Sequence, residues 1–275
     1  MRAALISEAR KLTTTQLWWI VSIVMAAYMA MLGAMLAFSF TIDPESMQGG
    51  SLGSGSGSET PALTARQVAE AVYTLAPTLG YVFPLVMGAL AMTGEYRHRT
   101  ITVTVLAEPR RSVVLVAKLV VQFVFGAVLG LLGTAGAVLG GAAVLMVVGE
   151  PTLLGDSGIW ANIGWSVVAL ALWGVIGVGV GTLVPNQVAS VVGILVFTQL
   201  VEPLLRLGLA AIEGAGEIAK YLPGAAAEAL AGASLYSASG LAELLGRWQG
   251  GLVLLGYALA LALAGRLTTM RRDIT

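Results

Sequence analysis

Few residues in this chain have the types and spacing that catalysis requires. Residues 155–158, Gly-Asp-Ser-Gly, could present a serine nucleophile, but that chemistry needs a histidine base beside the serine. The only histidine, His98, lies in a basic segment that is assigned below to the other side of a membrane. Asp156 and Ser157 are therefore expected to form a turn or to cap a helix.

Nucleotide and metal chemistry have no support in the sequence either. It contains no GxxxxGK[ST] loop, no cysteine and no cluster of metal-ligating residues, so we expect no catalytic residue, metal or cofactor in the chain itself. Residues 177–181, Gly-Val-Gly-Val-Gly, lie in an apolar stretch with no following lysine, which favours close helix packing over a nucleotide-binding loop. The same interpretation applies to the pairs Gly126/Gly130 and Gly136/Gly140.

The composition of the chain places it in a membrane. Its 275 residues have a mean hydropathy of +0.87, 57% are hydrophobic and 11% are charged, whereas a soluble domain carries roughly a quarter charged residues. So much apolar surface requires lipid as part of the solvent. The net charge is zero, which gives no indication of nucleic-acid binding.

Six uncharged or nearly uncharged runs approach or exceed the roughly 20 residues that span a bilayer as a helix. We therefore predict an all-α membrane protein in which 1–275 form a single transmembrane domain. The third run is too long for one upright span, so we expect a tilt, a bend or an interfacial end. The predicted spans are residues 17–40, 71–93, 112–148, 159–184, 187–206 and 248–266.

The distribution of lysine and arginine predicts the orientation of these spans. One side of the predicted topology carries 11 of the 15 basic residues and only four acidic ones, so we place it, with both termini, in the cytoplasm. These basic residues are Arg2, Arg10, Lys11, Arg97, Arg99, Arg110, Arg111, Lys118, Arg266, Arg271 and Arg272.

Two segments outside the spans have the composition of short membrane-associated helices. Residues 1–16 repeat apolar side chains at helical spacing next to basic ones, which predicts an interfacial helix; for residues 1–8 an ordinary cytoplasmic flank is an equal alternative. Residues 202–249 contain apolar stretches too short to cross, broken by Gly, Pro and single charges, and are predicted to form short helices in the outer leaflet. The tract 49–58 has the composition of a flexible linker and is assigned no function.

One ion pair is predicted near the outer boundary of the fifth span. Glu202 and Arg206 are one helical turn apart and can pair. Ionisable residues at membrane depth are candidates for function, either as a substrate contact or as a structural pair that caps the helix. The position of Glu202, roughly 22 Å along the span at 1.5 Å per residue, favours the structural role.

Residues 94–111, between the second and third spans, concentrate charge in an otherwise apolar chain. Gly94 can end the second helix, and Glu95 and Arg99 at i,i+4 favour a short helix that Pro109 would close. The alternating β-branched run 100–105, Thr-Ile-Thr-Val-Thr-Val, reads locally as a strand. A single strand here has no obvious partner, so a helix is the prediction.

The same segment resembles the signature of ABC-2 type permeases, the membrane subunits of one class of ABC exporter. The signature combines an acidic residue, Thr-Ile, a leucine, Pro-Arg and a later lysine. Family members often carry Gly immediately before the Thr, where this chain has Arg99. The matching residues are Glu95, Thr100-Ile101, Leu106, Pro109-Arg110 and Lys118. Together with the six spans, the amphipathic start and the broken helices before the last span, the resemblance covers nearly the whole chain.

The resemblance implies that the segment 94–111 is a coupling helix seated in a groove of a separate ATPase subunit. Two ATPase copies, which bind ATP and Mg, would drive a pair of permease chains. The pair is expected to be a homodimer among the lipids of the bacterial plasma membrane. The residues expected to transmit the ATPase movement are Glu95, Arg97, His98, Arg99, Thr100 and Ile101.

In this family the substrate path lies between two permeases and is lined chiefly by the second and fifth spans. The nearly uncharged span interiors indicate a lipophilic substrate, such as a drug, an antibiotic or a lipid. Two alternatives remain open, a stand-alone secondary transporter or channel and a membrane scaffold that docks a cytosolic partner. The candidate lining residues are Tyr73, Tyr81, Phe83, Met87, Phe197 and Gln199.

Overall fold

A computed structural model describes residues 1–42, 63–212, 215–233 and 244–268 of the chain. Within these ranges the chain forms helices joined by turns and contains no strand. The Gly/Ser tract 49–58 and part of the segment 202–249 lie outside the described residues. Six described helices are long and apolar enough to cross a membrane: Leu17–Thr41, Ala65–Arg97, Arg111–Val148, Ser157–Leu183, Gln187–Leu209 and Arg247–Leu267.

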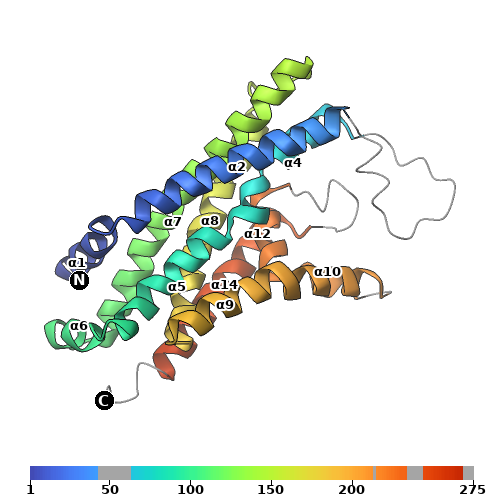
Figure 1. Ribbon diagram of the computed structural model, residues 1–275. Coiled ribbons are helices and arrows are strands. Elements are labelled where there is room, and N and C mark those ends of the chain that lie inside the picture. Colours follow the sequence, from blue (N-terminus) through green and yellow to red (C-terminus); the bar gives the residue numbers. More distant parts are fainter. Residues whose placement is uncertain (43–62, 213–214, 234–243, 269–275) are drawn as a thin grey trace.

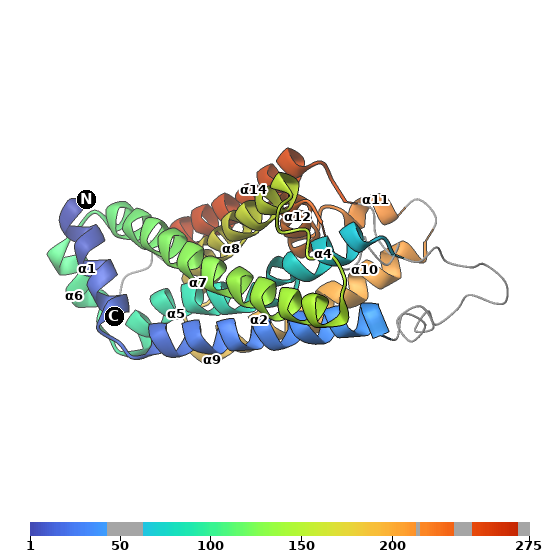
Figure 2. The ribbon, with the colours of Figure 1, turned by 90° about the horizontal axis from the view of Figure 1, so that it is seen from above.

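The long helices form one elongated bundle (Figure 1). Helix α7 (Arg111–Val148) lies between α2 (Leu17–Ile42) and α8 (Ser157–Leu183) and packs against both. On its other side α8 contacts α5 (Val82–Arg97) and α14 (Arg247–Leu267). The view from above shows α1 (Arg2–Thr13) and α6 (Ile101–Ala107) together at one end of the bundle (Figure 2).

Glycines allow the central helices to approach closely. A Cβ at Gly177 would overlap the carbonyl oxygen of Leu85 in α5, and a Cβ at Gly140 would overlap the carbonyl oxygen of Ala30 in α2. A larger side chain at either position would force the two helices apart. The interpretation of these glycines as packing residues is confirmed.

The second span is longer than predicted and is built in three pieces. It comprises α4 (Ala65–Tyr73), the π-helical turn η1 (Ala76–Gly80) and α5, instead of one helix over 71–93. It begins earlier because Thr64 and Gln67 form a capping box at the start of α4. It also ends later, because Gly94 lies inside α5 and the helix continues to Arg97.

The third span is a single unbroken helix. At 1.5 Å per residue, the 38 residues of α7 extend ~57 Å, well beyond the roughly 30 Å of a bilayer core. The extra length is therefore accommodated by tilt or by protrusion and not by a break. The helix ends at Gly149, whose φ of 87° is the left-handed conformation that glycine adopts most readily.

The fifth span also contains a π-helical turn. It runs from α9 (Gln187–Val196) through η2 (Phe197–Val201) into α10 (Glu202–Ala210), past the predicted end at residue 206. The predicted short helices before the last span are present in the described residues as α11 (Gly216–Ala219) and α12 (Pro223–Ala231). Every residue of α12 is buried, and the helix packs against α8 and α14.

Candidate functional site

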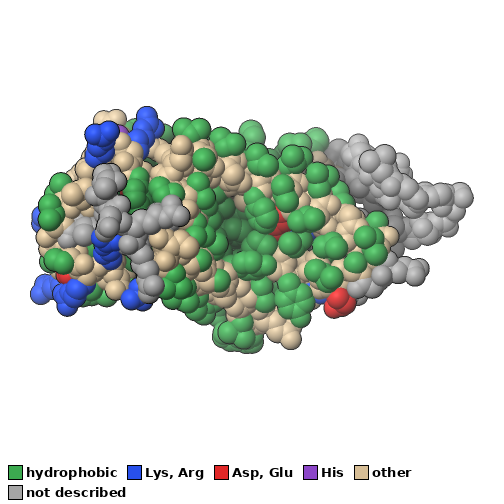
Figure 3. Space-filling view, turned by 90° about the horizontal axis from the view of Figure 1, so that it is seen from below, with side chains coloured by type: hydrophobic (Ala, Val, Ile, Leu, Met, Phe, Trp, Pro, Cys, Tyr) green, Lys and Arg blue, Asp and Glu red, His purple; other side chains and the backbone are tan. Residues whose placement is uncertain are grey.

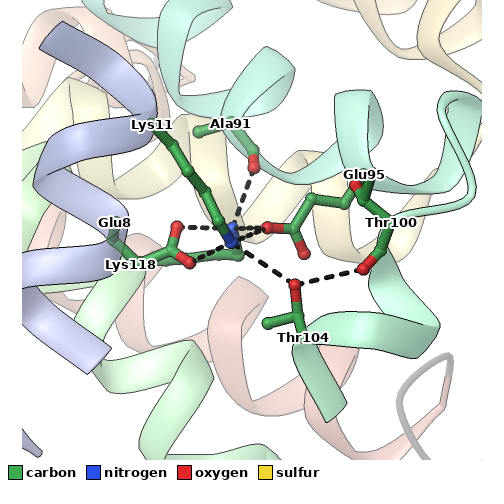
Figure 4. Close-up of polar contacts among 7 residues, drawn as sticks. All are labelled: Glu8, Lys11, Ala91, Glu95, Thr100, Thr104 and Lys118. Carbon is green, nitrogen blue, oxygen red and sulfur yellow. Dashed lines mark hydrogen bonds and ion pairs between the residues drawn. The ribbon is translucent and has the colours of Figure 1, made fainter. Parts of the chain in front are cut away.

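Four charged side chains from three helices form a closed ring at the end of the bundle that carries α1 and α6 (Figure 4). Lys11 Nζ lies 2.6 Å from Glu8 Oε1 and 2.5 Å from Glu95 Oε1. Lys118 Nζ lies 2.6 Å from Glu8 Oε2 and 2.8 Å from Glu95 Oε1. We call Glu8, Lys11, Glu95 and Lys118 the charge ring.

Most of the charge ring is removed from solvent. Lys118 is 2% exposed and also donates to the carbonyl oxygen of Ala91 at 3.1 Å, while Glu8 and Glu95 are buried and Lys11 reaches the surface. Two carboxylates and two ammonium groups balance each other, which is the condition under which buried charges are tolerated. Desolvation alone would lower the pKa of Lys11, but its hydrogen bonds to Glu8 and Glu95 outweigh that effect and raise the pKa.

The ring corrects two sequence-based assignments. Lys118 was counted among the basic residues of the cytoplasmic side, and it is a buried member of the ring instead of a surface charge. Glu95 was expected to support a helix together with Arg99, but it is part of α5 and pairs with Lys11 and Lys118. The amphipathic pattern of residues 1–16 gave no signal that Glu8 and Lys11 point into the bundle.

Helix α6 is connected to the ring and to the bundle core. Lys11 donates to Thr104 Oγ1 at 3.4 Å, and Thr104 in turn donates to the carbonyl oxygen of Thr100 at 3.2 Å. Ile101 is buried and packs in a cluster with Met92 and Leu115. The helical interpretation of the Thr-Ile-Thr-Val-Thr-Val run is thus confirmed, and tertiary packing overrides the local strand propensity.

The turn between α5 and α6 depends on one residue with unusual backbone geometry. Arg99 has a φ of 55°, in the left-handed region that favours glycine. This geometry turns the chain sharply after α5, so that α6 can fold back beside α7. Arg97, just before the turn, donates to Gln187 Oε1 at the start of α9 at 3.2 Å.

The outer face of α6 carries exposed apolar side chains. Val103 is 66% exposed and Leu106 is 77% exposed, three residues apart on one helical face. Four of the six predicted coupling residues are exposed just before α6 in the chain. The other two, Glu95 and Ile101, are buried and hold this region against the bundle. Lysine and arginine side chains gather at this end of the molecule, with hydrophobic side chains beyond them (Figure 3). The four exposed coupling residues are Arg97, His98, Arg99 and Thr100.

The predicted substrate-path residues do not share one surface. Tyr73, Tyr81 and Met87 are buried within the chain, and Tyr81 stacks on Trp173 with ring centroids 4.4 Å apart. Phe83 is partly buried and packs against the core, with its ring 5.9 Å from that of Tyr28. The remaining two, on the fifth span, are exposed: Phe197 and Gln199.

A second charged cluster lies where α10 meets α12. The predicted pair is present, with Arg206 Nη2 2.9 Å from Glu202 Oε1, and the structure adds Glu228 Oε1 at 3.0 Å from Arg206 Nη1. We call Glu202, Arg206 and Glu228 the acidic triad. The only sequence signal for Glu228 is that it is the single charge in the alanine-rich stretch of α12.

The Gly-Asp-Ser-Gly segment has a structural role. Asp156 caps α8 by accepting hydrogen bonds from the backbone N–H groups of Gly158 at 2.6 Å and Ile159 at 3.4 Å, as predicted. The hydrogen bond from Gly158 and the charge of Arg66 lower the pKa of Asp156. No group of three or more His, Cys, Asp or Glu side chains that could hold a metal occurs in the described part of the chain.

Comparison with known proteins does not assign the chain to a family. No protein-family model and no curated protein matches this sequence. The functional interpretation therefore rests on the geometry of the charge ring, of α6 and of the acidic triad.

Proposed function

We propose that this chain is the membrane-spanning permease subunit of an ATP-driven ABC exporter that works with a separate ATPase subunit. The observation that carries the proposal is the short helix α6, which is fixed to the bundle by Ile101 and presents Val103 and Leu106 to the surroundings. Exposed apolar side chains on a rigid helix, next to basic ones, are suited to docking in a groove of a partner protein.

The charge ring supports this role because it ties α6 to three other helices. A push on α6 would reach α1, α5 and α7 through Thr104, Lys11, Glu95 and Lys118. A ligand shifts a conformational equilibrium only if it favours one of the states, and ATP would supply that preference at the ATPase. The contact of α6 with the ring, from Lys11 to Thr104, lies at the surface, and the ring would pass the movement on to the spans through the buried pairs of Lys118 with Glu8 and Glu95.

The backbone at Arg99 adds support for the resemblance to ABC-2 permeases. Family members often have glycine at this position, and here the residue adopts the left-handed conformation that glycine favours. A left-handed backbone is one that a glycine at this position would also adopt, so the geometry is compatible with the family pattern although the residue differs.

The proposed topology places the basic end in the cytoplasm of a bacterium and the spans in its plasma membrane. The excess of lysine and arginine at this end supports that orientation. In this arrangement α1 lies at the inner interface, and α11 and α12 lie in the outer leaflet.

The proposed working unit contains two copies of this chain and two copies of the ATPase, which holds ATP and Mg. The substrate is lipophilic, a drug, an antibiotic or a lipid, and moves outward from the cytoplasm or the inner leaflet. The apolar span surfaces support this class of substrate because charged residues are nearly absent from them.

Co-expression with the ATPase encoded beside the gene tests the proposal. The chain is purified through its own tag, and ATP hydrolysis is measured in lipid for the wild type and for the double variant Arg97→Glu/Arg99→Glu. We expect the ATPase to co-purify with the wild type, and the double variant to lose the ATPase or to uncouple hydrolysis from added substrate.

The matched control is Arg2→Glu/Arg10→Glu, which makes the same charge change at the same end of the bundle, at exposed positions of α1 away from the turn between α5 and α6. This control should retain the ATPase. If no ATPase co-purifies with the wild type, or if both double variants behave alike, the role of α6 in coupling is rejected and a stand-alone transporter or a scaffold explains the chain better.

A further inference from the structure

A small polar cavity lies beside the acidic triad, where the second and fifth spans meet α12. Its volume is about 50 Å³, more than the roughly 10–15 Å³ that a single water needs. Leu79 and Pro203 contribute apolar wall, and the face of the molecule that α9 and α10 border is mostly hydrophobic (Figure 3). The polar residues that line the cavity are Thr78, Tyr81, Thr198, Gln199, Glu202 and Glu228, with Arg206 at one side.

Both spans depart from regular α-helix at this cavity. Of the residues that line the cavity, Thr78 and Leu79 belong to η1, and Thr198 and Gln199 belong to η2. These are the two π-helical turns in the described part of the bundle. The Tyr81 hydroxyl donates to the carbonyl oxygen of Thr198 at 3.2 Å and so joins the two turns. π-helical turns are rare and occur frequently at functional sites.

Glu202 and Thr78, which line this cavity, each have a buried oxygen without a hydrogen-bond partner among the described residues. Glu202 is 1% exposed, and its Oε1 accepts from Gly224 N at 2.6 Å and from Arg206, whereas its Oε2 has no hydrogen-bond partner among the described residues. Thr78 Oγ1 is also buried and unpartnered in the described structure. A buried carboxylate oxygen without a donor is costly, so the site is incomplete as it stands.

The described side chains that line the cavity do not balance in charge. Glu202 and Glu228 bring two negative charges and Arg206 brings one positive charge, which leaves one carboxylate in excess. The cluster lies ~22 Å along the fifth span from Gln187, within the thickness of a bilayer. An excess charge at this depth is expensive unless a counter-charge accompanies it.

We propose that this cavity binds a single cationic group, the ammonium head of a lipophilic amine, between Glu202 Oε2 and Thr78 Oγ1. An ammonium group supplies the missing charge and donates to both unpartnered oxygens, and the apolar surroundings accept its hydrocarbon tail. As a statement about the exporter's substrate, the inference rests on the proposed function and narrows the substrate class to lipophilic amines.

Binding is measured on the purified full-length chain in lipid nanodiscs, without any ATPase, by thermal unfolding followed through tryptophan fluorescence. The probe is hexylammonium, and hexanol is the uncharged compound of the same length. We expect hexylammonium and not hexanol to raise the unfolding temperature, and Glu202→Gln to weaken the apparent affinity by about tenfold or more.

Thr78→Val provides a second variant that keeps the side-chain size, and it should weaken hexylammonium binding by a smaller factor. The matched control is Glu217→Gln, the same change at an exposed carboxylate of α11, which should bind like the wild type. Sodium chloride and potassium chloride supply a cation without a hydrocarbon tail. They test whether a free metal ion, instead of an amine, stabilises the cavity.

Three results would overturn the proposal: no stabilisation by hexylammonium, equal stabilisation by hexanol, or unchanged binding in both cavity variants. Stabilisation by sodium or potassium without any by hexylammonium would also reject the amine. Because the assay uses the chain alone, a failure here leaves the ATPase partnership untouched, and a failed co-purification leaves the cavity result intact.

Discussion

The two buried charged clusters of this molecule differ in how their charges are compensated. The charge ring holds two carboxylates and two ammonium groups in a closed cycle with contacts of 2.5–2.8 Å. The acidic triad holds two carboxylates around one guanidinium, beside a cavity. The ring is balanced and closed, whereas the triad has an excess charge and an open side.

This difference indicates different roles for the two clusters. A balanced buried network resists deformation, because removing one member leaves an uncompensated charge. An unbalanced cluster beside a cavity is stabilised by anything that brings the missing charge. We infer that the ring transmits force between helices and that the triad responds to a ligand.

The largest effect should follow from breaking the ring with Glu95→Gln. This change leaves Lys11 and Lys118 to share the single charge of Glu8, and loss of one partner of a buried pair costs about 3–5 kcal/mol. Reversible unfolding in mixed micelles measures the free energy of unfolding. A loss below about 1 kcal/mol would mean that the ring is not a structural unit.

The same substitution in the triad should have a much smaller effect. In Glu202→Gln the amide oxygen can still accept from Gly224 and Arg206, and Glu228 then balances Arg206 one to one. We expect the free energy of unfolding to change by less than about 1 kcal/mol or to rise. A loss as large as that of Glu95→Gln, measured in the same micelles, would remove the distinction between the two clusters.

A smaller effect should come from the backbone next to the ring. Arg99→Gly relieves a left-handed conformation that costs a non-glycine residue energy, and should raise the free energy of unfolding by about 0.5–1 kcal/mol. The matched control Arg97→Gly changes the last residue of α5 and removes its hydrogen bond to Gln187, and should lower the free energy of unfolding by about 0.5–1 kcal/mol. Equal effects of the two substitutions would show that the turn at residue 99 is not strained.

The sequence predicted most of the architecture but little of the polar chemistry. Hydropathy alone located six long helices, because an apolar run of about 20 residues has few alternatives to a helix. Residue spacing also predicted the short helix α6 and the ion pair of Glu202 with Arg206, because both features depend on residues close together in the chain. Contacts between distant segments have no such local signal.

The missed residues are those whose role depends on such distant contacts. Glu8 and Lys118 are 110 positions apart and meet only after α1 packs on α7. Glu228 joins Arg206 only because α12 folds back against the fifth span. The π-helical turns were also missed, since they shift the register of a helix without changing its hydropathy pattern.

Site-specific cross-linking tests the central claim, that α6 docks on an ATPase, most directly. The chain contains no cysteine, so Leu106→Cys places a single thiol on the exposed face of α6, and Ile218→Cys places one on exposed α11 at the other end. With a bifunctional thiol- and amine-reactive reagent and the co-expressed ATPase, we predict a cross-linked product for Leu106→Cys and none for Ile218→Cys. Cross-linking at both positions, or at neither while the ATPase remains bound, would contradict the account.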